Sequence, residues 1–359
     1  MDADLGPNNH VRRDLEYFRA FKRDCTGVAI DSADVDFEEF IGFLDVEHYL
    51  GLRGPDTWSI EGNESQILLK WYLGKVLWER QATMKSVPSP YLRFAEALRP
   101  GDIVLTFNYD SLLEVSLDLV ERPYRLFPER FSEIGVTVHG VDSTREEVVI
   151  LKLHGSVDWF DRSPYEERLE VANGTARNTG VEYVPRDPVF GPDSIVQPVP
   201  LVDGPRPPGD PLSKIYRVFD PAPLYRGNHP RATPFILSPS YSKILYASRL
   251  LGFWYGLGRG GAWHLAMGII GFSLPDHDEY VRQMLYSLTR GYTDSWWEEE
   301  FAGKRKLPLR IVDFRQGEIA EADLRHRYRF LDWSRTEVFL HGFGEQAVDF
   351  LFAEQPSTA

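Results

Sequence analysis

Three short segments of the sequence place polar side chains and glycines directly after apolar runs. They are Asn108-Tyr109-Asp110, His154-Gly155-Ser156 and Gly271-Phe272-Ser273. Together they offer a carboxylate, which stabilises developing positive charge, and an imidazole, which accepts a proton near neutral pH. Their glycines allow a phosphate or a ribose to approach the main chain closely. These residue types suit a site that binds such groups and moves a proton.

Each of these segments follows a short run of β-forming residues. The runs are 102–108, 148–153 and 265–270, and a fourth run, 309–313, ends at Asp313. Runs this apolar are typical of parallel strands that are buried on both faces, and helical patterns separate them. The alternation predicts an α/β fold with a Rossmann-like, mostly parallel sheet and flanking helices. Since ligands bind outside the carboxyl ends of such strands, we expect the three segments to meet at one edge.

Each residue also has a purely structural interpretation. Asn108 and Asp110 could form a local turn and cap the next helix. His154 could be a hydrogen-bonded histidine at a strand end, and Gly271 and Ser273 could be ordinary turn and cap residues. The functional hypothesis therefore rests on the joint occurrence of these residues at successive strand ends.

The regions around the predicted sheet differ in character. Residues 1–100 read as helical, with helices at 14–23, from Asp36 and from near Ser65. Thirteen of the 25 prolines fall between Pro185 and Pro234, and the segment 161–234 has few periodic apolar runs. We therefore expect one domain made of 1–160 and 235–359, interrupted by a proline-rich insertion or lid at 161–234 that has no core of its own.

Composition excludes several classes of protein. The chain has 359 residues and a formal net charge of −14, so its surface repels phosphate backbones and we expect no nucleic-acid partner. Its single cysteine, Cys25, excludes an internal disulfide and a four-cysteine zinc site. No apolar run is long enough to cross a membrane, and the polar N-terminus has no signal-peptide core, which predicts a cytoplasmic protein.

The ordered set of motifs resembles the sirtuin-like family. Thr106-Phe107-Asn108-Tyr109-Asp110 resembles its T-x-N-x-D element, and Lys152-Leu153-His154-Gly155-Ser156 resembles its histidine-glycine element. Gly271-Phe272-Ser273-Leu274 resembles its later glycine-serine element. The amino acids within these motifs are similar to those of the prokaryotic branch of the family. The resemblance extends over roughly residues 30–350.

The resemblance implies a role for each residue. Asn108 and Asp110 would hold the nicotinamide and its ribose, with Thr106 beside them, and His154 would act as general base next to Gly155. On the adenosine side of the cofactor, the contacts would come from Gly271 and Ser273. Asp313 would hydrogen-bond the adenine ribose, or would alternatively be a solvated carboxylate at a strand end.

The sequence departs from the family pattern in two places. A buried strand ending in G-A-G-x-S is missing, and Leu5-Gly6-Pro7-Asn8-Asn9 is the nearest early glycine turn. We therefore expect that the chain starts just after that motif, that the first strand is missing, and that the cofactor cleft is incomplete or is completed by a partner chain or a second copy. The paired cysteines of the deacylases are also absent, so we expect no zinc.

The resemblance leaves three functions open. The first is an NAD glycohydrolase, which splits NAD⁺ into nicotinamide and ADP-ribose, in the setting of anti-phage defence that the prokaryotic branch implies. The second is a non-catalytic nucleotide-sensing or interaction module, and the third is an NAD-dependent protein deacylase. All three predict NAD or a related nucleotide as the partner, and the sequence leaves open whether the chain is an enzyme.

Overall fold

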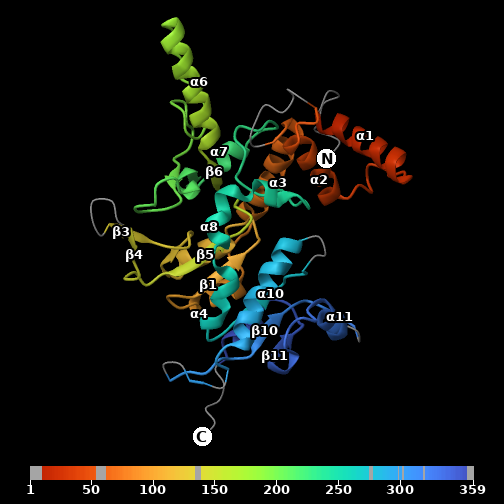
Figure 1. Ribbon diagram of the computed structural model, residues 1–359, viewed down its shortest axis with the longest axis vertical. Helices are drawn as coiled ribbons and strands as arrows, with labels where there is room; N and C mark the ends of the chain where they lie inside the picture. Colours follow the sequence, from red (N-terminus) through yellow and green to blue (C-terminus); the bar gives the residue numbers. More distant parts are fainter. Residues whose placement is uncertain are drawn as a thin grey trace. The chain divides into compact units, whose positions relative to one another are not determined.

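The computed structural model describes residues 10–53, 62–133, 139–274, 278–297, 299–300, 303–317 and 320–353. The chain divides into two compact units. Unit 1 comprises Met1–Lys85, Ile103–Ser111 and Tyr124–Gly252, and unit 2 comprises Ser86–Asp102, Leu112–Pro123 and Phe253–Ala359. Both units combine helices with short parallel sheets, which confirms the predicted α/β class (Figure 1). The early glycine turn at 5–9 lies outside the described residues.

Unit 1 begins with helices, as the periodicity predicts. They are α1 (His10–Phe21), which continues into a π-helical turn (Lys22–Thr26), α2 (Phe37–Tyr49) and α3 (Glu64–Ala82). The Asp36 carboxylate caps α2 by accepting from the amide of Glu39 at 2.9 Å. Asn63 and Gln66 form a reciprocal capping box at the start of α3. Apolar side chains from the three helices form a common core: Val11, Phe18, Phe40, Ile41, Leu44 and Leu69.

The parallel sheet of unit 1 has the order β1-β5-β2. Its strands are β1 (Ile103–Thr106), β5 (Val148–Lys152) and β2 (Tyr124–Arg125), and β1 and β5 pair from Ile103–Val149 to Thr106–Lys152. Every residue of β5 is buried, as expected. The prediction that β1 is also buried on both faces is wrong, because Ile103 is 45% exposed and the other three residues of β1 are only partly buried. A separate hairpin consists of β3 (Phe131–Glu133) and β4 (His139–Val141).

The proline-rich region is more ordered than the sequence predicts. It contains α6 (Ser163–Thr179), a 3₁₀ turn (Pro211–Lys214), α7 (Ala222–Tyr225) and an antiparallel sheet of β6 (Trp159–Asp161), β8 (Ile215–Arg217) and β7 (Val199–Pro200). The expectation of no core here is wrong, since four buried side chains cluster: Phe160, Val189, Val218 and Leu224. Pro164, Pro211 and Pro223 each lie in the first turn of a helix, where proline is tolerated, so prolines begin elements here rather than prevent them. The boundaries 161–234 remain a prediction.

The chain after this region is irregular at first. Residues 235–237 form a single bridge, between Ile236 and Gly155. A 3₁₀ helix, η4 (Lys243–Leu250), and α8 (Leu251–Trp254) follow.

Unit 2 contains a second parallel sheet, of order β11-β10-β9. Its strands are β9 (Gly268–Ile270), β10 (Leu309–Val312) and β11 (Thr336–Phe339). Its helices are α4 (Ser89–Ala97), α5 (Leu112–Leu119), α9 (Leu257–Gly260), α10 (Glu279–Asp294), α11 (Ala320–Arg327) and α12 (Glu345–Phe352), with 3₁₀ turns at Gly261–Trp263 and Trp333–Arg335.

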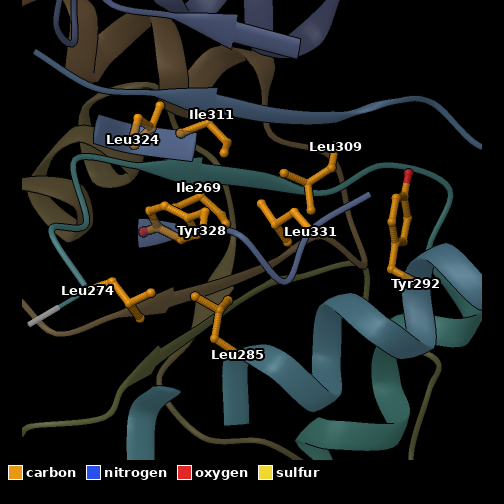
Figure 2. Packing of buried hydrophobic residues seen from close by; sticks show 9 residues of the cluster. All are labelled: Ile269, Leu274, Leu285, Tyr292, Leu309, Ile311, Leu324, Tyr328 and Leu331. Carbon is orange, nitrogen blue, oxygen red and sulfur yellow. The ribbon is translucent and has the colours of Figure 1, made fainter. Parts of the chain in front are cut away.

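Side chains from these strands and helices pack into one cluster in unit 2 (Figure 2). Ile269 of β9 and Leu309 and Ile311 of β10 lie in it beside Leu285 and Tyr292 of α10. The buried apolar stripe of α10 runs through Val281, Leu285, Leu288 and Tyr292.

Candidate functional site

The segments that carry Asn108 and His154 leave neighbouring parallel strands at the same edge. Thr106 is the partner of Lys152 in the β1–β5 ladder, and Asn108 and His154 each lie two residues beyond this pair. The amide of Leu153 donates to the Thr106 carbonyl at 2.9 Å, so the pairing continues past the strand ends. The rings of Phe107 and His154 are 4.8 Å apart. The structure therefore brings these two predicted site segments together.

The turn that carries Asn108 and Asp110 is held by its neighbours. The Asn108 amide donates to the Thr106 hydroxyl at 3.1 Å, so the threonine, rather than the asparagine, supplies a side-chain oxygen to this turn. The Lys152 ammonium group donates to the carbonyl of Asp110, and the amide of Val157 donates to the carbonyl of Tyr109 at 3.0 Å. The Asn108 side chain is exposed at the strand end, where it can meet a ligand.

The end of α3 fixes the far side of this turn. The Ser111 amide donates to the Gln81 side-chain oxygen at 3.1 Å, and the Gln81 amide group donates to the Ser111 hydroxyl at 2.8 Å. Two hydrogen bonds between the same two residues orient the turn relative to the helix. The helical N-terminal region therefore helps to position the predicted site.

His154 is buried, with 5% of its surface exposed. Burial and, to a smaller extent, the positive charge of Lys243 together lower its pKa from 6.5 to about 3. The imidazole is therefore neutral at physiological pH and can accept a proton, although its basicity in this state is low. Its ring lies against Phe107 and 6.3 Å from the ring of Tyr109.

The backbone conformation and the packing at position 155 both require glycine. Its φ is +81°, and a Cβ atom would lie 2.1 Å from the Phe235 carbonyl oxygen. This close approach allows the Ser156 amide to donate to Phe235 at 3.1 Å, and the Leu237 amide to donate to the His154 carbonyl at 2.8 Å. Packing against Phe235 therefore explains why residue 155 is glycine. A contact between Gly155 and a cofactor remains a prediction.

Sequence reasoning missed two contributors to this arrangement. The first is the segment 235–237, which pairs with His154–Ser156 and accepts, at the Leu237 carbonyl, from the Tyr109 hydroxyl at 2.6 Å. The second is Lys243, which is buried with 4% of its surface exposed and acts electrostatically on His154. One signal in the sequence could have identified Lys243. It follows the polar run Ser238-Pro239-Ser240-Tyr241-Ser242, which comes directly after an apolar segment.

The remaining predicted residues lie in unit 2. The Gly271 amide donates to the Val312 carbonyl at 2.8 Å, so Gly271 and Asp313 follow neighbouring parallel strands. Gly271 has a φ of +58° and open space where a Cβ atom would stand, and Ser273 is exposed. The Asp313 carboxylate accepts from Arg315 at 2.7 Å, so it is ion-paired rather than simply solvated.

The predicted site residues thus form two groups, each described within its own unit. The group in unit 1 is Thr106, Asn108, Asp110, His154 and Gly155, and the group in unit 2 is Gly271, Ser273 and Asp313. Their union in one dinucleotide cleft remains a prediction.

Metal and membrane features can be assessed for the described ranges. Within them, no group of three or more histidine, cysteine, aspartate or glutamate side chains is arranged to hold a metal ion. Cys25 is exposed. Among the helices of those same ranges, none has the length and apolar character needed to cross a membrane.

Comparison with known proteins addresses the resemblance directly. Residues 102–173 match the family model described as SIR2-like domain, and no curated protein matches the chain. The matched segment contains β1, β5 and both Asn108 and His154. Members of this family generally bind NAD. Residues 102–173 are therefore similar to a SIR2-like domain, and the parallel α/β structure around them agrees with a sirtuin-like assignment of this segment.

Proposed function

We propose that the protein is an NAD glycohydrolase, which cleaves NAD⁺ with water into nicotinamide and ADP-ribose. One observation carries the proposal: the paired ends of β1 and β5 present Asn108 and His154 at the same edge of a parallel sheet. This edge is where α/β proteins bind nucleotides.

In the proposed reaction, the bond between the nicotinamide nitrogen and the ribose carbon breaks, and nicotinamide leaves with the electron pair. Asn108 would orient the nicotinamide carboxamide, and the Asp110 carboxylate would stabilise the positive charge that develops on the ribose. A water oxygen then bonds to the ribose carbon, and His154 would accept the proton that this water loses.

The low pKa of His154 bears on this role. General base catalysis is most effective when the pKa of the base lies near the working pH, and the pKa of His154 is about 3. NAD⁺ carries a negatively charged diphosphate, and a negative charge placed near an imidazole raises its pKa. The proposal therefore requires that the bound dinucleotide makes His154 more basic.

The same burial favours a second candidate function. A buried, weakly basic His154 beside Lys243 suits a protein that binds the dinucleotide without cleaving it. In this case the protein would be a nucleotide-sensing or interaction module, and Asn108 would contribute to affinity rather than to rate.

We also propose that a second chain completes the cleft. Within the described ranges β1 pairs with β5 alone, and Ile103 and the neighbouring β1 residues are at least partly exposed. The edge of an end strand offers backbone groups to a further strand.

The resemblance to the prokaryotic branch further suggests a cytoplasmic protein that acts through NAD depletion in defence.

The test is nicotinamide release from NAD⁺ by the purified protein, with binding followed in parallel by calorimetry. Loss of the base in His154→Ala should lower the rate by ~10²–10⁴-fold, and Asn108→Ala should also lower it. His229 is exposed, so His229→Ala is the matched control and should retain full turnover.

The outcomes separate the two functions. Turnover that is equal in all four proteins would remove the assigned roles. Dinucleotide binding without nicotinamide release would favour the nucleotide-sensing function instead.

A further inference from the structure

A pocket lies in unit 1, and none of the predicted site residues Asn108, Asp110 and His154 at the ends of β1 and β5 (the strand-end site) lines it. Its volume is about 480 Å³, which is within the range of pockets that hold small molecules. Its walls come from the end of α2, from α3, from η4, from the start of the α6 region and from residues 233–237. No motif identified in the sequence accounts for this pocket.

One end of the pocket is a hydrogen-bonded polar cluster. His48 and the Tyr246 hydroxyl, which both line the pocket, are hydrogen-bonded at 2.7 Å. The Lys70 ammonium nitrogen lies 5.3 Å from the centre of the Tyr246 ring. Behind them, the fully buried Asp45 carboxylate accepts from the Gln66 amide group at 2.5 Å and from a serine hydroxyl. These groups hold one another in place, so this end of the pocket is preorganised.

The charges around the pocket do not favour a phosphate. The Arg249 guanidinium donates to the Asp161 carboxylate at 2.9 Å and to the Ser163 hydroxyl at 2.8 Å. Lys70 lies near the Asp45 carboxylate, and Glu167 adds an exposed negative charge at the pocket. Cations and carboxylates thus balance, with no surplus of positive charge for a polyphosphate.

The other walls are aromatic and apolar. Tyr49, Phe235 and Leu245 line the pocket, and Tyr49 and Leu245 are 59% and 40% exposed. Aromatic side chains in a pocket favour the binding of a ligand with a planar ring, because the ring can stack on the face of the side chain. A planar ligand with hydrogen-bonding groups at one end and no net negative charge fits this combination.

We propose that this pocket binds an uncharged nucleoside. The base would lie against the Tyr49 and Phe235 side, and its polar edge or ribose would meet His48 and Tyr246. Phe235 belongs to the segment whose backbone pairs with His154–Ser156, so the pocket shares a wall with the support of His154. The inference does not depend on catalysis at the strand-end site.

The test is a calorimetric titration of the full chain with adenosine, with AMP as the charged comparator. Ser248 lines the pocket from η4 and is exposed, so Ser248→Trp should fill the pocket without disturbing the core. The matched control is Val171→Trp on α6, because Val171 is 71% exposed and does not line the pocket.

The wild type and Val171→Trp should bind adenosine alike, and Ser248→Trp should bind it at least tenfold more weakly. AMP should bind more weakly than adenosine, because its phosphate adds negative charge near Asp161 and Glu167. The proposal is overturned if adenosine does not bind the wild type, if Ser248→Trp binds it undiminished, or if AMP binds as tightly as adenosine. Undiminished binding to Ser248→Trp would place adenosine elsewhere on the chain.

Discussion

Replacing His154 by glutamine should make the stability of the protein less sensitive to acid. The pKa of this imidazole is about 3 in the folded chain against an ordinary value of 6.5, because the ring is buried and Lys243 lies near it. As the pH falls below 6.5, the unfolded chain takes up a proton on this histidine and the folded chain does not. The stabilising contribution of neutral His154 is therefore complete above pH 6.5 and is lost progressively toward pH 3.

The magnitude follows from these two pKa values. Between pH 7 and pH 5, protonation of the unfolded state should remove ~2 kcal/mol from the free energy of unfolding. His154→Gln keeps a polar side chain of similar size that does not titrate, so this part of the loss should vanish. The variant is expected to have a lower free energy of unfolding at pH 7, since the buried ring is lost. The prediction is therefore tested by the change in unfolding free energy with pH, and not by its value at pH 7.

The assay is urea unfolding at pH 7, 6 and 5 for the wild type, His154→Gln and the exposed-histidine control His229→Gln. The wild type and the control should each lose ~2 kcal/mol more than His154→Gln over this range. Equal losses in all three proteins would refute the reasoning, since they would show that His154 titrates alike in the folded and unfolded states.

Two further predictions concern buried contacts in unit 1. Gly155→Ala should destabilise the protein by more than ~2 kcal/mol, because its Cβ would meet the Phe235 carbonyl oxygen at 2.1 Å. Gly180→Ala, which has a similar φ of +72° but open space around it, should cost ~1 kcal/mol, and equal losses of unfolding free energy would contradict the packing argument. Asp158→Ala should cost ~3–5 kcal/mol in urea unfolding, because it leaves the guanidinium of the buried Arg217 without the carboxylate 2.7 Å away; a loss below ~1 kcal/mol would show that the pair is not structurally important.

The sequence predicted the elements that have strong local signals. β5 and β10 follow from apolar runs, and the start of α2 follows from Asp36. The short strands β2 to β4 and β6 to β8 were missed, because each has only two or three residues. Segments this short have no periodicity of their own and depend on their partners for definition.

The candidate site shows the same division. The meeting of Asn108 and His154 could be predicted, because each follows an apolar run that reads as a parallel strand. The pairing of 235–237 with His154–Ser156 could not be predicted, because it joins residues about 80 positions apart and leaves no local pattern. Nor could the low pKa of His154 be predicted, since it arises from burial and from a lysine distant in sequence.

The most direct test of the account is a double-mutant cycle for NAD⁺ affinity, measured by calorimetry on the wild type, Asn108→Ala, His154→Gln and the double variant. If the two side chains act on one bound dinucleotide, their effects on binding should couple by ~0.5–3 kcal/mol. Additive effects, or no NAD⁺ binding by the wild type, would contradict a shared site at the ends of β1 and β5.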